Sequence, residues 1–361
     1  MGQNWDCTND TLQFRFSDSS DQDLKERDTK RIFLKKSATV FDPIGFLGPF
    51  LLETKLLFQT LCISKINWDD KLPPEIQEKW TRLKRQSPFL NQIKLARYLL
   101  MNKDVWKHYL VTFCDASNQS FASCVHLVTR YTDNTTSTVL LFSKNRVAPI
   151  KLHEKAKDND PLTIVRLELL AMVVGARIGT YIEDTLQNKM KIERTFYFTD
   201  SQINLCRLKK SYSFYKQCVM KEITFLTKVN SWFFVPTDKN LADIASRSMD
   251  SVQNLIISQL WCKGPEFLFS SLINLKSMGN SLSKNEYTSA DVERREVLLN
   301  VMALTFDHTV KYQKPLIYEL LNRFSNWLCS ISFIGVILRF AHPFFKAFRG
   351  KNRSVQEVNL T

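Results

Sequence analysis

Four acidic residues stand where a carboxylate has no evident structural purpose. Two of these acids stand at the end of apolar runs that are typical of buried strands. A third lies inside an apolar helix pattern, and the fourth lies just after a polar turn. They are too widely spaced in the sequence for a local motif, so only the fold could bring them together. The four are Asp115 in Val111-Thr-Phe-Cys-Asp-Ala-Ser117, Glu168 in Arg166-Leu-Glu-Leu-Leu170, Asp200 in Phe196-Tyr-Phe-Thr-Asp-Ser201, and Asp243 in Asn240-Leu-Ala-Asp-Ile-Ala-Ser246.

Four carboxylates at one place repel each other, and divalent cations relieve that repulsion. Magnesium prefers oxygen ligands in an octahedral arrangement. Two such ions about 3.5–4 Å apart can activate a water molecule and stabilise the leaving oxygen of an in-line phosphodiester displacement. The acids therefore predict two Mg²⁺ ions, with Mn²⁺ as a substitute, and cleavage of a phosphodiester without a nucleophilic side chain.

Each acid taken alone also has an ordinary structural interpretation. Asp115 could cap a turn, and Asp200 with Ser201 could cap the next helix. Glu168 could pair with Arg166 or another base, and Asp243 could favour a helix N-terminus. The metal site depends on the combination of all four.

The elements that must position these acids follow from hydrophobic periodicity and turn residues. Strand-rich runs alternate with helical patterns, which is typical of an α/β layer fold with helices on the faces of a sheet. The expected order is strands over 105–114, 121–131 and 137–147, a helix over 161–186, a strand over 194–199, a helical stretch over 201–229, a strand over 231–235, and a helix from Leu241.

The flanking regions predict mainly helices. Alternation at Leu12, Phe14 and Phe16 favours one strand, the polar run 17–23 reads as a loop, and 29–100 reads as helices with breaks. The bases Lys79, Arg82, Lys84 and Arg85 are interpreted as a solvated helix face rather than a nucleic-acid contact. A polar stretch over 270–286 predicts a linker, and 291–361 predicts amphipathic helices with a basic end.

Composition narrows the class of protein. The 361 residues carry a net charge of +14, which suits a polyanionic partner such as nucleic acid, although a merely basic surface is the alternative. With 9 glycines there is no Walker or dinucleotide loop. The 8 cysteines form no zinc pattern and predict reduced thiols, with Cys114 and Cys124 as buried apolar residues.

The N-terminus lacks a signal peptide, and the most apolar stretch, 327–338, is too short to cross a membrane. We expect an intracellular protein of the cytoplasm, a virus-like particle or the nucleus.

Several motifs resemble the polymerase polyprotein of Bel/Pao-class LTR retrotransposons, the region known as the Pao retrotransposon peptidase family with its ribonuclease H domain. The specific blocks are Ala38-Thr-Val-Phe-Asp-Pro-Ile-Gly-Phe-Leu-Gly-Pro49 and Asn240-Leu-Ala-Asp-Ile-Ala-Ser-Arg247. Further matching segments are Lys30-Arg-Ile-Phe-Leu34, Trp68-Asp-Asp70, Phe113-Cys-Asp-Ala-Ser117, Val235-Pro-Thr237 and Trp261 to Leu268.

The resemblance implies a ribonuclease H-like domain, a five-stranded mixed sheet with helices on both faces. It implies that Asp115, Glu168, Asp200 and Asp243 are both the catalytic acids and the metal ligands. The implied organisation is a reverse-transcriptase thumb or connection-like segment over 1–103, the nuclease over 104–250, and a helical linker over 251–361 before a missing integrase. The implied partners are an RNA–DNA hybrid and the polymerase and integrase regions of a parent polyprotein, with no membrane.

The chain departs from this family in ways that open a second hypothesis. The stretch Pro236 to Ala242 lacks the histidine that many ribonucleases H carry before the last acid, and Leu241 replaces a frequent proline. A catalytically weak or inert nucleic-acid-binding or scaffold fragment is therefore the alternative. An aspartic peptidase role is disfavoured because no Asp-Thr-Gly or Asp-Ser-Gly triplet is present.

Residues 104–250 hold 20 basic and 15 acidic residues, which leaves positive charge for phosphates. Bases and aromatics interleave after Asp200, and this segment is interpreted either as a hybrid-binding surface or as a solvated face. The predicted nucleic-acid contacts are Ser117, Asn118, Ser201, Arg207, Lys209, Lys210, Tyr215 and Lys216.

Overall fold

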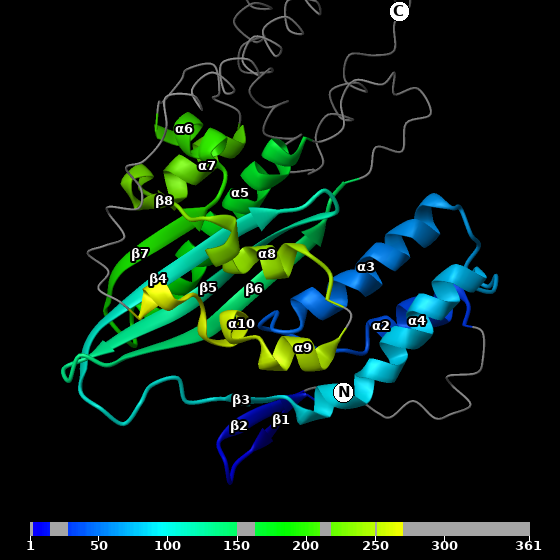
Figure 1. Ribbon diagram of the computed structural model, residues 1–361, viewed down its shortest axis with the longest axis horizontal. Coiled ribbons are helices and arrows are strands. Elements are labelled where there is room, and N and C mark those ends of the chain that lie inside the picture. Colours follow the sequence, from blue (N-terminus) through cyan, green and yellow to red (C-terminus); the bar gives the residue numbers. More distant parts are fainter. Residues whose placement is uncertain (1–2, 15–27, 150–162, 210–217, 250, 270–361) are drawn as a thin grey trace, which may run out of the picture. The chain divides into compact units, whose positions relative to one another are not determined.

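The computed structural model describes residues 3–14, 28–149, 163–209, 218–249 and 251–269, all within one compact unit over 1–293. Its centre is a five-stranded sheet with the strand order β6-β5-β4-β7-β8 (Figure 1). The strands are β4 (Val105–Ala116), β5 (Ser120–Tyr131), β6 (Thr136–Val147), β7 (Ile192–Thr199) and β8 (Trp232–Phe234).

The sheet is mixed. Strands β6, β5 and β4 pair antiparallel, whereas β4 pairs with β7 and β7 with β8 in parallel. The parallel register places Cys114 opposite Thr199, so the residues that follow, Asp115 and Asp200, come at the same edge of the sheet. The predicted α/β class and the five-stranded mixed sheet are confirmed.

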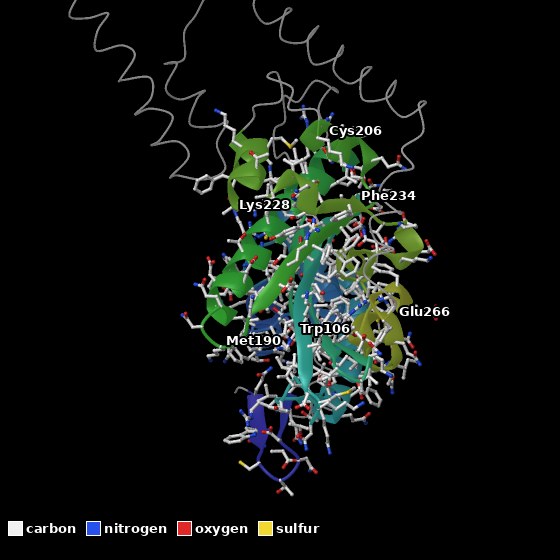
Figure 2. The ribbon with its side chains drawn as sticks, turned by 90° about the vertical axis from the view of Figure 1, so that its left-hand side faces the viewer. Trp106, Met190, Cys206, Lys228, Phe234 and Glu266 are labelled. Carbon is white, nitrogen blue, oxygen red and sulfur yellow. The ribbon has the colours of Figure 1, made fainter. Side chains whose placement is uncertain are left out.

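Helices cover both faces because both faces of the central strands are apolar. On β4, Leu110 and Cys114 face one layer, and Val111 and Phe113 face the other. The first layer consists of α5 (Ile164–Leu186), α6 (Gln202–Lys209) and α7 (Cys218–Leu226). The second includes α3 (Gly48–Ile63), α8 (Leu241–Ser246), α9 (Val252–Ile257) and α10 (Gln259–Lys263). Figure 2 shows the sheet between these layers, with Met190 on one side and Glu266 on the other.

The segment before residue 93 packs on the second layer. It contains α2 (Lys30–Ser37), α3, α4 (Pro74–Gln86) and the 3₁₀ turn η1 (Ser87–Gln92). A proline opens α4, and Ile76, Trp80 and Leu83 are buried along it. One apolar cluster joins Phe33, Phe113 and Trp261, which belong to three distant parts of the chain. The boundaries near 103 and 250 remain predictions.

The turn Asp42 to Gly45 connects this segment to the outer strand of the sheet. Asp42 accepts the backbone N–H groups of Phe46 and Leu47 at 3.1 and 2.8 Å, which fixes the start of α3. The Ser143 N–H of β6 donates to the Ile44 carbonyl at 2.7 Å. This Asp-Pro-Ile-Gly block therefore has a structural role, because it anchors α3 to β6.

The sequence prediction of the N-terminal part was incomplete. A second sheet with the order β1-β2-β3 contains β1 (Gln3–Asp6), β2 (Thr11–Phe14) and β3 (Lys94–Ala96). Only a strand near β2 was expected. The other two strands are three or four residues long, and their stability depends on pairing partners far away in the sequence.

The described chain ends with α9, α10 and the 3₁₀ turn η5 (Glu266–Leu268). The expected loop over 17–23, linker over 270–286 and helices over 291–361 lie outside the described residues. Among the described residues, no helix combines the length and apolar character needed to cross a bilayer. Free thiols are found at Cys7, Cys62, Cys114, Cys124, Cys206 and Cys262, and Cys114 and Cys124 are buried as predicted.

Candidate active site

Asp115 lies at the C-terminal end of β4 with 4% of its surface exposed. Its Oδ2 accepts a 2.5 Å hydrogen bond from the Ser246 hydroxyl of α8. Burial and, after it, the negative charges of Asp200 and Asp243 together raise the pKa of this carboxyl to about 7, against the opposing hydrogen bond from Ser246. A buried acid between two other acids is a site that favours a cation or a proton.

Asp200 follows β7 directly and is held by the turn before α8. Thr237 Oγ1 donates to Asp200 Oδ2 at 2.8 Å, while Oδ1 of the same carboxylate is buried and has no hydrogen-bond partner among the described residues. The cap of α6 is Ser201, whose hydroxyl accepts the Asn204 N–H at 3.4 Å. Asp200 is therefore not explained as a helix cap.

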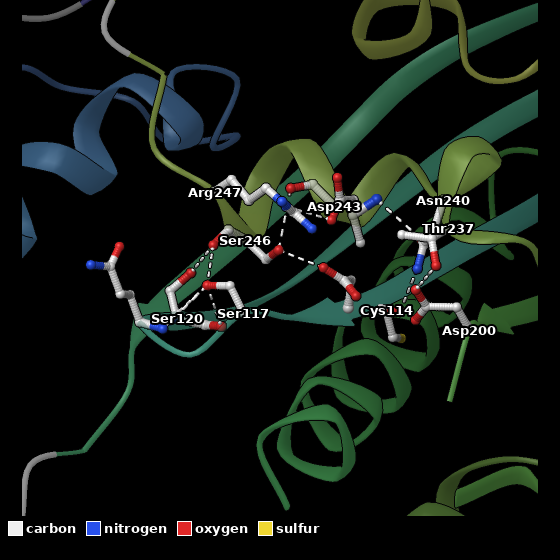
Figure 3. A network of polar contacts seen from close by, with 12 residues as sticks. Cys114, Ser117, Ser120, Asp200, Thr237, Asn240, Asp243, Ser246 and Arg247 are labelled. Carbon is white, nitrogen blue, oxygen red and sulfur yellow. Dashed lines mark hydrogen bonds and ion pairs between the residues drawn. The ribbon is translucent and has the colours of Figure 1, made fainter. Parts of the chain in front are cut away.

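Asp243 lies in the first turn of α8. The N-cap of that helix is Asn240, whose side chain accepts the Ala242 N–H at 3.2 Å and donates to the Cys114 carbonyl at 3.1 Å. The second bond attaches α8 to the end of β4. Asp243 itself pairs with Arg247 at 2.7 Å. Figure 3 shows these contacts, with Asp200 and Thr237 beside Asn240.

Ser246 fixes the other end of α8. Its carbonyl oxygen accepts hydrogen bonds from the hydroxyls of Ser117 and Ser120 at 2.8 and 2.5 Å (Figure 3). The helix that carries Asp243 is thus attached at both ends to the β4–β5 region that carries Asp115. Ser117, rather than Asp115, caps this turn by accepting the N–H of Ser120 at 3.2 Å.

Glu168 lies half-buried on α5 and is held through residues that follow Asp200. Ser201 Oγ donates to Glu168 Oε2 at 2.5 Å, and Asn204 Nδ2 approaches the same oxygen at 3.5 Å. Asn204 is fully buried and also donates to the Val165 carbonyl at 2.8 Å. The fold therefore brings Asp115, Asp200 and Asp243 together and connects Glu168 to them through Ser201.

The chemistry of these groups fits divalent cations. All are hard oxygen donors, Asp200 Oδ1 is a buried carboxylate oxygen without a partner in the described chain, and crowding of like charge surrounds Asp115. However, the described residues contain no group of three or more His, Cys, Asp or Glu side chains already placed to hold one ion. Asp243 and Glu168 are instead engaged by Arg247 and Ser201. Cation binding would thus require these acids to exchange partners.

The predicted nucleic-acid contacts have different surroundings. Asn118 and Lys209 are exposed, Ser117 is half-buried, and Ser201 is buried. Arg207 is 7% exposed and donates to Asn204 Oδ1 at 3.2 Å, so the alternative of a solvated face does not hold for this side chain. Lys210, Tyr215 and Lys216 lie outside the described residues.

Sequence reasoning missed the hydroxyl and amide groups that hold the acids. These are Ser246, Thr237, Asn240 and Asn204. Ser246 follows Asp243 by one helical turn, and Asn240 has the residue type and position of an N-cap, so local signals existed for both. Thr237 and Asn204 act across the fold and had no such signal.

The strand order and the acids at the edge of the sheet define an RNase H-like domain. Residues 29–201 match the family model described as "Pao retrotransposon-like RNaseH-like domain", and this segment belongs to that Pao-class retrotransposon family. The match includes Asp115, Glu168 and Asp200. No curated protein sequence matches the chain.

Solved structures also align with the chain at low similarity. The N-terminal RNase H domain of Rv2228c from Mycobacterium tuberculosis, fused to maltose binding protein, is 13% identical, with 38% of this chain and 93% of that chain covered and a TM-score of 0.24. LC11-RNase H1 in complex with an RNA/DNA hybrid is 12% identical, with 38% and 91% covered and a TM-score of 0.24. RNase H1 from Halobacterium salinarum is 10% identical, with 38% and 91% covered and a TM-score of 0.23.

Proposed function

We propose that this chain is a metal-dependent endoribonuclease that cleaves the RNA strand of RNA–DNA hybrids, with Asp115, Glu168, Asp200 and Asp243 as its catalytic acids and metal ligands. The observation that carries the proposal is the crowding of negative charge around the buried Asp115, whose pKa is raised to about 7. Such crowding is unfavourable unless a proton or a cation compensates for it. The RNaseH-like family description of residues 29–201 supports the class of reaction.

Each side chain has a distinct part in this proposal. Ser246 orients the Asp115 carboxylate, and Thr237 orients Asp200 so that its Oδ1 stays free. Ser201 holds Glu168 at the same end of the sheet. Bound Mg²⁺ ions would supply the positive charge that activates water and stabilises the leaving oxygen of the phosphodiester.

The substrate proposal rests on shape and charge. A hybrid duplex is recognised through its minor groove, phosphates and 2′-hydroxyls rather than its bases. Lys209 on α6 and Asn118 in the β4–β5 turn are exposed positions that suit such contacts. We propose that residues 104–250 carry the nuclease, and that polymerase and integrase regions of a parent polyprotein are its partners.

The test uses the full chain and a hybrid labelled on its RNA strand. We expect cutting with Mg²⁺ or Mn²⁺, none with EDTA, and none of the same RNA annealed to RNA. Asp200→Asn should abolish cutting while leaving the melting temperature within a few degrees of wild type. Asp69→Asn is the matched control, because Asp69 is an exposed acid paired with Arg31. A folded wild-type chain that cuts no hybrid with either metal would refute the proposal.

A second candidate is a nucleic-acid-binding scaffold without catalysis. It is favoured by the engagement of Asp243 with Arg247 and by the absence of three gathered ligands in the described residues. It predicts hybrid binding of the same strength with EDTA and with Mg²⁺, and no turnover. The cleavage assay and a binding titration on one sample separate the two functions.

A further inference from the structure

Asp243, one of the acids at the edge of the sheet, forms an ion pair with a basic side chain. Arg247 Nε lies 2.7 Å from Asp243 Oδ1, and no other ion pair to Asp115, Asp200 or Asp243 occurs among the described residues. A positively charged group therefore already sits at the rim of the crowded carboxylates. A metal cation that binds the Asp243 carboxylate would therefore compete with Arg247.

The ion pair between Arg247 and Asp243 is accessible to solvent and weak enough to be replaced. The Arg247 side chain is 66% exposed and Asp243 is 27% exposed. Arg247 follows the last residue of α8 with extended backbone, so the helix does not confine its side chain. Exposed ion pairs of this kind contribute only about 0–1 kcal/mol, which is little to overcome.

The other contacts of α8 are of a different kind. Buried hydrogen bonds join Asn240 to the Cys114 carbonyl and join Ser246 to Asp115 and Ser120. None of these bonds involves Arg247. Release of Arg247 would therefore free the Asp243 carboxylate without moving the helix that carries it (Figure 3).

We propose that Arg247 is an exchangeable counter-ion of the site: it occupies Asp243 in the absence of metal and, once a divalent cation replaces it there, binds a phosphate of the nucleic-acid substrate. The inference rests on the proposed nuclease function and names the residue that couples metal binding to substrate binding. A divalent ion competes well for Asp243 because its charge is twice that of the guanidinium. The released guanidinium presents a planar fork that matches phosphate oxygens.

The competition can be measured without any catalysis. Titration of the full chain with MgCl₂ by calorimetry should give a Kd that is roughly 3-fold to 5-fold lower for Arg247→Gln than for wild type, the size expected for loss of an exposed ion pair. Lys107→Gln is the control. It removes the same charge from an exposed pair with Glu193 at the other end of β4, and it should leave the Mg²⁺ affinity unchanged.

The proposed binding of Arg247 to a substrate phosphate is tested with a cleavage-resistant 2′-fluoro RNA–DNA hybrid. With Mg²⁺ present, Arg247→Gln should bind this hybrid about 10-fold more weakly, and its log Kd should depend on log salt with a slope lower by about 1. With EDTA the variant and wild type should differ little, because Arg247 is then held by Asp243. Arg247→Lys should recover part of the affinity in Mg²⁺, since it restores the charge but not the fork.

The outcomes separate this inference from the proposed function. An unchanged or weaker Mg²⁺ affinity of Arg247→Gln, or a hybrid affinity loss that is equal with and without Mg²⁺, overturns the exchange. If wild type cuts hybrids under those circumstances, the nuclease proposal stands. A folded wild type that neither binds Mg²⁺ nor cuts overturns both.

Discussion

Two aspartates among the residues that the structure describes are almost completely buried, and their surroundings are opposite. Asp28, which is 2% exposed, accepts hydrogen bonds from Trp80 Nε1 at 2.6 Å and from Lys84 and Lys36 at 3.0 Å each. Asp115, which is 4% exposed, has one hydroxyl partner and two acidic neighbours.

The two buried carboxylates differ in the sign of the charges that surround them. Around Asp28 the positive partners come from α2 and α4, so the contacts join these helices and satisfy the carboxylate. Around Asp115 the fold supplies more negative charge. Removing one partner of a buried pair such as that of Asp28 is costly for the fold, whereas a buried acid surrounded by like charge marks a candidate functional site.

The strongest way to test this contrast is to neutralise Asp115. Asp115→Asn should reduce cleavage of a labelled hybrid by roughly a thousand-fold, because the removed charge is needed to hold the cation. The folded protein should be at least as resistant to urea at pH 8 as wild type, since repulsion by Asp200 and Asp243 is relieved. A loss of several kcal/mol in the free energy of unfolding would show that Asp115 is structural.

The same substitution at the matched acid should have the opposite consequences. Asp28→Asn leaves buried Lys84 without its counter-charge and should lower the free energy of unfolding by about 3–5 kcal/mol in urea titrations. The reference is Asp69→Asn, which breaks an exposed pair and should not shift the urea midpoint measurably. Equal free energies of unfolding for Asp28→Asn and Asp69→Asn would contradict a structural role for Asp28.

Gly45 tests whether the segment before residue 93 depends on its attachment to β6. Its φ is +76°, and an added Cβ would run into the Ser143 backbone. Gly45→Ala should cost more than about 2 kcal/mol in the free energy of unfolding, since neither strain nor the clash can be relieved locally. Gly48→Ala, where the nearest atom is Asn145 Nδ2 at 3.4 Å, should cost much less. Comparable losses in both variants would argue against the anchor.

A further expected effect is on the pH dependence of stability. Burial raises the pKa of Asp42 to about 6, and burial with like charge raises that of Asp115 to about 7. The folded state therefore binds more protons than the unfolded state between pH about 4 and 7. The contribution of these groups to stability is full at low pH and is lost as pH rises through that range.

Thermal unfolding at several pH values checks this sign. Asp115→Asn should flatten the decline between pH 6 and 8, and 10 mM MgCl₂ should raise the melting temperature of wild type more at pH 8 than at pH 5. A wild-type stability that rises through this range would contradict the charge crowding at the site.

Much of the fold could be predicted because its signals are local. The long strands β4 and β5 are rich in apolar residues, and the helix α5 shows its period over more than five turns. The short strands β1 and β3 were missed because three or four residues carry too little pattern. Lys84 was assigned to a solvated face because nothing local indicates that Asp28 lies beside it.

The candidate site was predictable in its acids and not in their contacts. Asp115 and Asp200 each follow an apolar strand, which the sequence alone reveals. The donors Ser246 and Thr237, the burial of Arg207 and the engagement of Glu168 by Ser201 required the fold. Whether Asp115, Glu168, Asp200 and Asp243 bind metal remains the proposal that the experiments above address.

By itself, the sequence determined the α/β class, the strands and helices that are long enough to show a period, and the order of the four acids along the chain. Tertiary structure alone decided which buried charges are matched and which are not. The reason is physical: periodicity depends on neighbours within a few residues, whereas the free energy of a buried carboxylate depends on every charge and hydrogen-bond donor within several ångströms, wherever these lie in the sequence.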